Sequence, residues 1–301
     1  MALGNLAQRF LVAVVAVPLL LLLLHYHRPE PTWAVLFVAS LIAMYEFFAM
    51  TLPAPDRRPA LVMGGLACIA FYWLDAIALA RYGNTVPVEL HRLAFGGGTT
   101  VALMFAVVVP GLFFLFRFRD IPTVANRMTA TVMGIVYAGF LTTMLAKLKL
   151  IDPTHGGSTV LIVLLIAWLA DTGGYFAGRF LGKAKLYEAV SPKKTWAGAW
   201  GGIAGSIAGV AALKLISAPW LTWIDVFALA IPGGILGQLG DLAESLIKRS
   251  VGVKDSGALL PGHGGILDRI DAVLFIAPYV FIYLTIRGYL TIRGYGPSAL
   301  F

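Results

Sequence analysis

Residues 240–271 are rich in acidic and basic residues, within a sequence that is otherwise strongly apolar. That stretch carries five carboxylates, four cations and a histidine. Polar groups at membrane depth cost free energy, so they are functional candidates. Carboxylates hold divalent cations, and Lys and Arg hold phosphate oxygens. The segment, with help from residues 171–196, predicts a metal and phosphate site at the edge of a membrane.

The first polar residues of this segment follow the period of an α-helix. Their spacing is i, i+3, i+4, i+7 and i+8, and apolar residues occupy the other face. They are Asp241, Glu244, Ser245, Lys248 and Arg249. This face can bind a metal ion at its acidic end and phosphate at its basic end. It is equally typical of a helix that leaves the membrane with ion pairs such as Glu244–Lys248, and both interpretations stay open.

A glycine-rich turn at 261–271, PGHGGILDRID, precedes another predicted helix start. Backbone without Cβ atoms can approach a ligand closely and direct N–H groups at an anion. Asp268 and Asp271 then share one helical face, with Arg269 beside them. Carboxylates on two adjacent helices suit Mg²⁺, which leaves room for water and substrate phosphates. The expected metal ligands are Asp241, Asp268, Glu244 and Asp271.

Two upstream segments supply further candidates for phosphate binding. In 168–183, Asp171, Tyr175 and Arg179 recur every four residues on one helical face. Glycine-based helix packing, with Arg179 reaching the headgroups, is the alternative, but it does not account for Asp171. SPKKTW at 191–196 is interpreted either as a phosphate clamp or as an ordinary basic loop. The expected substrate contacts are Ser191, Lys193, Lys194, Lys254, His263, Gly264 and Gly265, together with Asp171, Tyr175 and Arg179.

The composition predicts an all-α polytopic membrane protein. The chain is 59% hydrophobic and 13% charged, whereas soluble domains carry about a quarter charged residues. Nine transmembrane helices are expected, at 11–24, 32–51, 60–80, 93–116, 128–147, 159–180, 199–218, 221–240 and 270–287. The run at 11–24 is interpreted as a retained first helix, with a signal peptide as the alternative. Glu46 lies deep in the second span, so a cation or hydroxyl partner is expected.

The basic residues predict how these helices are oriented. With the N-terminus cytoplasmic and the C-terminus outside, 15 Lys and Arg residues lie inside and 8 outside, as the positive-inside rule favours. One continuous membrane domain is expected, with N-terminal scaffold helices in 1–158 and catalytic helices in 159–301. Cytoplasmic loops are expected at 182–198 and 241–269. The sequence has no basic arm of the kind that binds nucleic acid, so a nucleic-acid partner is not expected.

The motifs and their order resemble those of the phosphatidate cytidylyltransferase (CDP-diacylglycerol synthase) family. The resemblance lies in DTGGYFAGRxxGK from Asp171, SPKKTW from Ser191, GQLGDLAES from Gly237, and the run from Ser245 to Asp271. It implies transfer from CTP to phosphatidate, Mg²⁺, a second ion such as K⁺, a homodimer and a bacterial inner membrane location. It also implies that Asp241 and Asp268 are the metal-site residues. The expected catalytic residues are Asp241, Asp268, Lys248, Arg249 and Arg269.

Two alternative functions are consistent with the sequence. A CTP-dependent polyprenol or phytol kinase would use a hydroxyl acceptor in place of phosphatidate. An ion-coupled transporter would use the acids to line an ion path, although the polar residues crowd one edge and no inverted repeat is evident.

Overall fold

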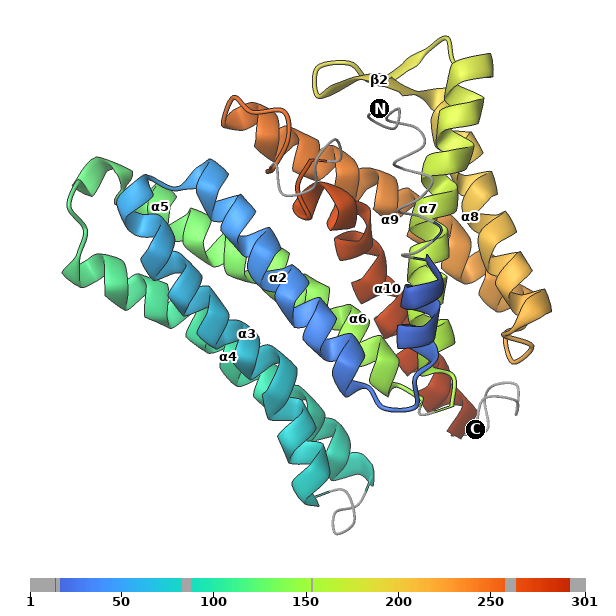
Figure 1. Cartoon of the computed structure of the whole chain (residues 1–301), viewed down its shortest axis with the longest axis horizontal. Helices are drawn as coiled ribbons and strands as arrows, with labels where there is room; N and C mark the ends of the chain where they lie inside the picture. The colour runs from blue at the N-terminus through green and yellow to red at the C-terminus, as the bar shows by residue number, and fades with distance from the viewer. Residues whose placement is uncertain (1–13, 15–16, 83–87, 153, 258–263, 293–301) are drawn as a thin grey trace, which may run out of the picture.

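The structure of this chain is a computed structural model that describes residues 14, 17–82, 88–152, 154–257 and 264–292 (Figure 1). It is nearly all α-helical, as expected. The helices are α2 (Glu30–Thr51), α3 (Ala54–Tyr82), α4 (Val88–Phe116), α5 (Ile121–Gly134), the π-helix η1 (Ile135–Phe140), α6 (Leu141–Leu150), α7 (Gly156–Leu181), α8 (Trp196–Ile216), α9 (Trp223–Ser250) and α10 (Leu267–Ile292). A short antiparallel hairpin, which was not predicted, joins β1 (Lys185–Tyr187) to β2 (Ser191–Thr195).

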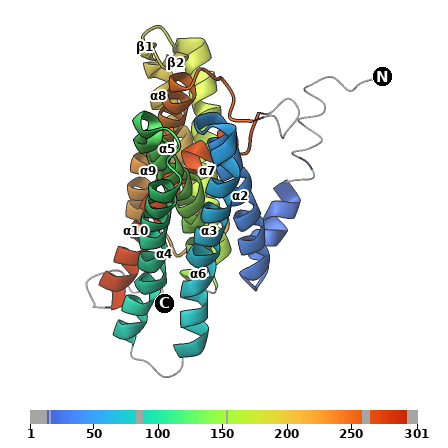
Figure 2. The ribbon, with the colours of Figure 1, turned by 90° about the vertical axis from the view of Figure 1, so that its left-hand side faces the viewer.

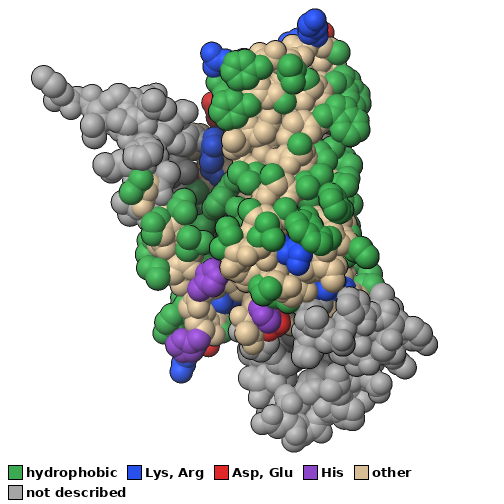
Figure 3. Space-filling model, turned by 90° about the vertical axis from the view of Figure 1, so that its right-hand side faces the viewer, with side chains coloured by type: hydrophobic (Ala, Val, Ile, Leu, Met, Phe, Trp, Pro, Cys, Tyr) green, Lys and Arg blue, Asp and Glu red, His purple; other side chains and the backbone are tan. Residues whose placement is uncertain are grey.

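Seven helical segments within the described residues are long and apolar enough to cross a membrane. They are 30–51, 98–116, 121–150, 156–181, 196–216, 223–250 and 267–288. Of the two other predicted spans, 60–80 lies in the helix α3 but outside this set. The span 11–24 is helical at its described residues, 14 and 17–24, and is also outside this set. Large apolar side chains are exposed on α7 and α8, and Figure 3 shows such side chains over much of this face. The number of nine spans and the orientation of the termini stay predictions.

The last helix, α10, lies between two groups of helices (Figure 1). Its residues Leu267 and Leu274 pack into an apolar cluster with side chains of α2, α3 and η1. On the other side, Val273 and Ile276 pack into a second cluster with side chains of α6, α7 and α9. Both clusters remove apolar side chains from their surroundings, so α10 connects the N-terminal helices to those that carry most of the predicted site.

The helix α9 extends farther than the predicted boundaries. A capping box between Thr222 and Asp225 starts it, and Lys248 and Arg249 lie in its last turn, where cations favour the helix dipole. The predicted loop at 241–269 is therefore corrected, because residues 241–250 continue the helix. Figures 1 and 2 show the end of α9, the start of α10 and the hairpin at the same end of the bundle.

Glycines allow α7 and α8 to touch backbone to backbone. A Cβ atom at Gly173 would lie 2.3 Å from the carbonyl oxygen of Gly201, and one at Gly205 would lie 2.1 Å from that of Leu169. Real Cβ atoms do not approach backbone so closely, so any larger residue must push the helices apart. The predicted packing role of small residues in 168–183 is therefore seen in the structure, beside the polar face that was also predicted.

Replacing Gly205 by Ala is expected to destabilise the protein by about 1–3 kcal/mol, as overpacking does elsewhere. Thermal unfolding of the purified protein in detergent measures this loss. Gly111→Ala is the matched control, because nothing lies within 4 Å of a Cβ at that helical position. An equal effect of the two substitutions would contradict the backbone contact between α7 and α8.

Candidate active site

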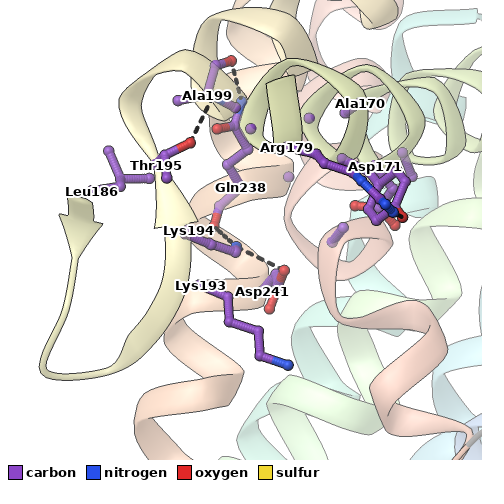
Figure 4. Close-up of a pocket in the computed structure, with 17 residues that line it drawn as sticks. Ala170, Asp171, Arg179, Leu186, Lys193, Lys194, Thr195, Ala199, Gln238 and Asp241 are labelled. Carbon is purple, nitrogen blue, oxygen red and sulfur yellow. Dashed lines mark hydrogen bonds and ion pairs between the residues drawn. The ribbon is translucent and has the colours of Figure 1, made fainter. Parts of the chain in front are cut away.

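A pocket of about 480 Å³ lies between α7, α8, α9 and the hairpin (Figure 4). Six polar residues that line it were singled out from the sequence: Asp171, Tyr175, Arg179, Lys193, Lys194 and Asp241. The remaining wall consists mainly of small residues, including Ala170, Gly174, Gly178, Gly198 and Ala199. This volume falls in the range of small-molecule sites, and the wall combines apolar surface with a few converging charges.

The hairpin carries two lysines to the acidic face of α9. Lys194 Nζ lies 2.7 Å from Asp241 Oδ2 and 3.5 Å from the backbone oxygen of Gln238. Figure 4 shows Lys193 beside this pair, with its side chain extended along the same opening. The side chains of Lys194 and Asp241 are 25% and 34% exposed, so a ligand can reach both.

Local hydrogen bonds hold these lysines in position. Thr195 ends β2 and caps α8, because its side chain accepts a hydrogen bond from the Gly198 N–H at 3.1 Å. Lys185 Nζ donates to the Pro192 carbonyl at 2.6 Å across the hairpin. The hexapeptide 191–196 is therefore a strand that enters a capped helix, and its lysines are attached to a fixed element.

The face of α7 adds a second cationic group to the pocket. Arg179 donates a hydrogen bond to the Tyr175 hydroxyl at 2.7 Å and lies 6.0 Å from the centre of that ring. Asp171 is close enough to Asp241 for repulsion and close enough to Lys194 and Arg269 for attraction. The sequence spacing of Asp171, Tyr175 and Arg179 thus brings all three to one pocket, as predicted.

Lys248 lies away from this pocket, between two buried acids. Its Nζ is 2.5 Å from Glu244 Oε2 and 2.6 Å from Asp268 Oδ1, and its side chain is only 9% exposed. The ion-pair interpretation of the Glu244–Lys248 spacing is thus what the structure contains. Lys248 serves here as the counterion of two carboxylates, and phosphate contact by Lys248 stays a prediction.

Asp268 is held by backbone as well as by Lys248. Its carboxylate accepts hydrogen bonds from the N–H groups of Ser256, at 3.0 and 3.2 Å, and of Gly265, at 2.8 Å. Gly264 has φ +77°, and a Cβ there would lie 2.6 Å from Asp268 Oδ2. The predicted need for glycine in this turn therefore has a physical cause, since the backbone must wrap closely around a carboxylate.

The other candidate residues are distributed around these two groups. Asp271 accepts a hydrogen bond from its neighbour's N–H at 2.7 Å and is near enough to Asp241 and Asp171 for repulsion. Arg249 donates to the Val253 carbonyl at 2.9 Å, beyond the end of α9.

The remaining candidate residues are Lys254, Arg269, Ser191 and His263. Lys254 and Arg269 are exposed, and Ser191 begins β2. His263 lies outside the described residues.

The structure divides the four expected metal ligands between the two groups. Glu244 and Asp268 surround Lys248, whereas Asp241 and Asp271 lie near Asp171. Among the described residues, no three His, Cys, Asp or Glu side chains are arranged to hold a metal ion. A magnesium ion bound with a nucleotide needs only one or two carboxylates, because phosphates and water complete its shell. Asp241, with Asp171 and Asp271 nearby, fits that requirement.

Several residues at the site were not singled out from the sequence. Gln238 lines the pocket and donates hydrogen bonds to the carbonyls of Ala199 and Gly234, both at 3.2 Å. Its position one helical turn before Asp241 was the available signal. Ser256 links Asp268 to Glu46, whose expected hydroxyl partner it provides. Only the fold brings these two residues together, because 210 positions separate them.

The sequence also matches known proteins. A model of the "Cytidylyltransferase family" matches residues 7–287. A protein of Staphylococcus epidermidis named "Phosphatidate cytidylyltransferase" is 38% identical over 250 residues, which cover 82% of this chain and 87% of that protein. A Bacillus subtilis protein of the same name is 28% identical over 266 residues, covering 77% and 98%. A third protein of this name, from Brucella suis, is 41% identical over 169 residues.

That third match covers 56% of this chain and 60% of the Brucella suis protein. The family match, by contrast, includes every helix from α2 to α9 and most of α10, and therefore both charged groups described above. On this coverage, and on the Staphylococcus epidermidis match, the chain belongs to the cytidylyltransferase family.

Proposed function

We propose that this chain is a membrane-embedded nucleotidyltransferase that makes CDP-diacylglycerol and pyrophosphate from phosphatidate and CTP. The observation that carries the proposal is the pocket in which Lys193, Lys194 and Arg179 face Asp241 and Asp171. Two polyanionic substrates need such a combination of cations and metal-binding carboxylates. The names of three similar proteins, each called a phosphatidate cytidylyltransferase, support the same reaction.

The proposed reaction requires positioning more than proton removal. A phosphate oxygen of phosphatidate forms a bond to the α-phosphorus of CTP, and the bond from that phosphorus to the leaving pyrophosphate breaks. The attacking oxygen is already anionic near neutral pH, so no strong general base is needed. The protein must instead hold two like-charged groups together and offset their repulsion.

The pocket residues supply these functions. Lys193 and Lys194 extend from the hairpin and would hold phosphate oxygens of CTP as point charges. Arg179, on the opposite wall, can grip a second phosphate through two N–H groups. Mg²⁺, when bound, would neutralise phosphate charge, and Asp241 is its proposed principal ligand. Asp268 and a second ion such as K⁺ remain part of the proposal on the strength of the family motifs. Glu244 and Asp271 remain part of it because of their helical spacing from Asp241 and Asp268.

The proposal includes a bacterial inner membrane location, a pocket facing the cytoplasm and a homodimer. Lys and Arg are more frequent in the connections at the proposed cytoplasmic side, which carries 15 of the 23. The hairpin and the end of α9 belong to this side. A cytoplasmic pocket also has direct access to CTP, while phosphatidate can reach it from the bilayer.

Labelled CTP distinguishes the proposed reaction from its alternatives. The purified protein in lipid nanodiscs is incubated with Mg²⁺, either α- or γ-labelled CTP, and either phosphatidate or a polyprenol. We expect the α-label to enter lipid only with phosphatidate and the γ-label to leave in pyrophosphate. Transfer of γ-label to an alcohol would identify a CTP-dependent kinase instead. Ion flux into liposomes without CTP would favour a transporter.

Replacing Lys193 by Ala is expected to raise the KM for CTP about tenfold, since one phosphate contact is worth roughly 1.4 kcal/mol or more. The turnover at saturating CTP should change much less. Initial rates over a range of CTP concentrations measure both quantities. Lys183→Ala, an exposed lysine just before the hairpin, is the control. An unchanged CTP dependence in Lys193→Ala would contradict a clamp by this lysine.

A further inference from the structure

Glu46, on α2, is a buried acid that binds a segment more than 200 residues later in the chain. It is 4% exposed. Its Oε1 accepts a hydrogen bond from the Ile266 N–H at 3.0 Å, and its Oε2 accepts from the Leu267 N–H at 2.9 Å and from the Ser256 hydroxyl at 3.1 Å. Ile266 and Leu267 lie at the N-terminus of α10, where unpaired N–H groups favour a negative charge.

Glu46 and Asp268 both bind the two described ends of the connection between α9 and α10. The connection after α9 passes Ser256 and returns at Gly265 to begin α10. Glu46 binds the Ser256 hydroxyl and the amides just after Gly265, whereas Asp268 binds the amides of Ser256 and Gly265. A shift of either carboxylate therefore moves a hydrogen-bond partner of the other.

Two glycines leave the space that the Glu46 carboxylate occupies. A Cβ at Gly257 would lie 2.6 Å from Glu46 Oε1, and one at Gly265 would lie 2.4 Å from Oε2 and 2.2 Å from the Ser256 Oγ. Both ends of the connection thus approach Glu46 so closely that a side chain on either glycine would displace it. The close approach of these two glycines therefore depends on the position of the Glu46 carboxylate. Its helix, α2, does not line the pocket described above.

Asp268 transmits the position of this connection to Lys248, whose ammonium it binds at 2.6 Å. Lys248 lies two turns after Asp241 on α9, and Asp271 follows Asp268 by one turn on α10. The start of α10 therefore determines where Asp271 stands relative to Asp241. Because Glu46 accepts hydrogen bonds from the first amides of α10, its position affects all of these contacts.

We propose that Glu46 is a positioning residue, which fixes the start of α10 and so sets the positions of Asp268, Lys248 and Asp271 relative to Asp241. The kinetic part of this proposal rests on the proposed function. The structural part does not, because it concerns only the hydrogen bonds that Ser256 and residues 265–268 make with the two carboxylates. If Glu46 only stabilised the fold locally, its substitution would disturb its own three hydrogen bonds and leave the hydrogen bonds of Asp268 unchanged.

Glu46→Gln is the informative variant because glutamine keeps the shape and one acceptor oxygen. Its amide nitrogen must face the N–H of either Ile266 or Leu267, which replaces an attraction by a repulsion. Hydrogen exchange of the full-length protein in nanodiscs measures the result. We expect exchange about tenfold faster at Ile266 and Leu267, and also at Ser256 and Gly265, whose amides are bonded to Asp268.

The same variant is expected to lower kcat for cytidylyl transfer roughly tenfold to a hundredfold, as small misplacements of reacting groups do. The KM for CTP should change less than about threefold, because the hairpin lysines are untouched. Ser256→Ala, which removes one bond to Glu46, should show the same pattern more weakly. Glu30→Gln, an exposed acid on the same helix, is the control and should match the wild type.

Each outcome decides the proposal. Faster exchange confined to Ile266 and Leu267, with kcat within twofold of the wild type, would reduce Glu46 to a helix cap. If Glu46→Gln fails to fold, Ser256→Ala provides the same comparison. If the wild type transfers no cytidylyl group, the proposed function fails, while the exchange at Ser256 and Gly265 still tests the positioning contact.

Discussion

Asp241→Asn is expected to reduce cytidylyl transfer about a thousandfold, since a metal ion that stabilises developing charge contributes several kcal/mol to catalysis. Asparagine keeps the shape but offers a neutral, weaker ligand. The fold should persist, because the Lys194–Asp241 pair is partly exposed and such pairs contribute at most about 1 kcal/mol. Turnover at several Mg²⁺ concentrations, together with thermal unfolding, measures both effects.

Asp255→Asn provides the matched control for this substitution. Asp255 is an exposed acid in the connection after α9, at the same end of the bundle. Its loss should change neither turnover nor the Mg²⁺ dependence. Turnover of Asp241→Asn close to the wild-type value at saturating Mg²⁺ would remove Asp241 from the metal assignment.

Lys248→Ala should cause the largest loss of stability among these variants, about 3–5 kcal/mol, as breaking a buried ion pair does elsewhere. It leaves two carboxylates together with no counterion, on side chains that are 1% exposed for Glu244 and 8% exposed for Asp268. The midpoint of thermal unfolding in detergent measures this effect. Lys183→Ala, at an exposed lysine, should leave the midpoint unchanged.

A double variant separates charge from packing at this site. Adding Glu244→Gln to Lys248→Ala removes one of the two stranded charges, so part of the lost stability should return. Repulsion between Glu244 and Asp268 predicts that the double variant is more stable than the single one. Equal midpoints would indicate that the packing of the Lys248 stem, rather than its charge, holds this part of the fold.

The residues that follow local spacing rules were predictable. Asp241, Glu244 and Lys248 share a helical face because helical period alone determines it, and the structure extends α9 through all three. The turn at Gly264 was predictable for a similar reason, because only glycine readily adopts φ +77°. Where two interpretations of one face were open, as for Glu244 and Lys248, the spacing could not decide between them.

Features that depend on tertiary contacts were not predictable in the same way. The hairpin has no Asn-Gly or Asp-Gly turn signal, and Pro192 argues against an ordinary strand. The division of the four expected metal ligands into two groups could not be predicted. One partner of Lys248, Asp268, lies 20 residues later on another helix. Glu46 was expected to have a partner, but nothing local identifies Ser256, Ile266 or Leu267 as its donors.

The long reach of Glu46 has a consequence for biosynthesis. A ribosome delivers α2 long before it delivers Ile266 and Leu267, so the carboxylate has none of its three final donors while most of the chain is being made. A bare carboxylate at that depth costs free energy, which its three hydrogen bonds offset once α10 is in place. Docking of the last helix is therefore the event that matures this region. A nascent chain that ends before residue 256 lacks all three donors of this carboxylate.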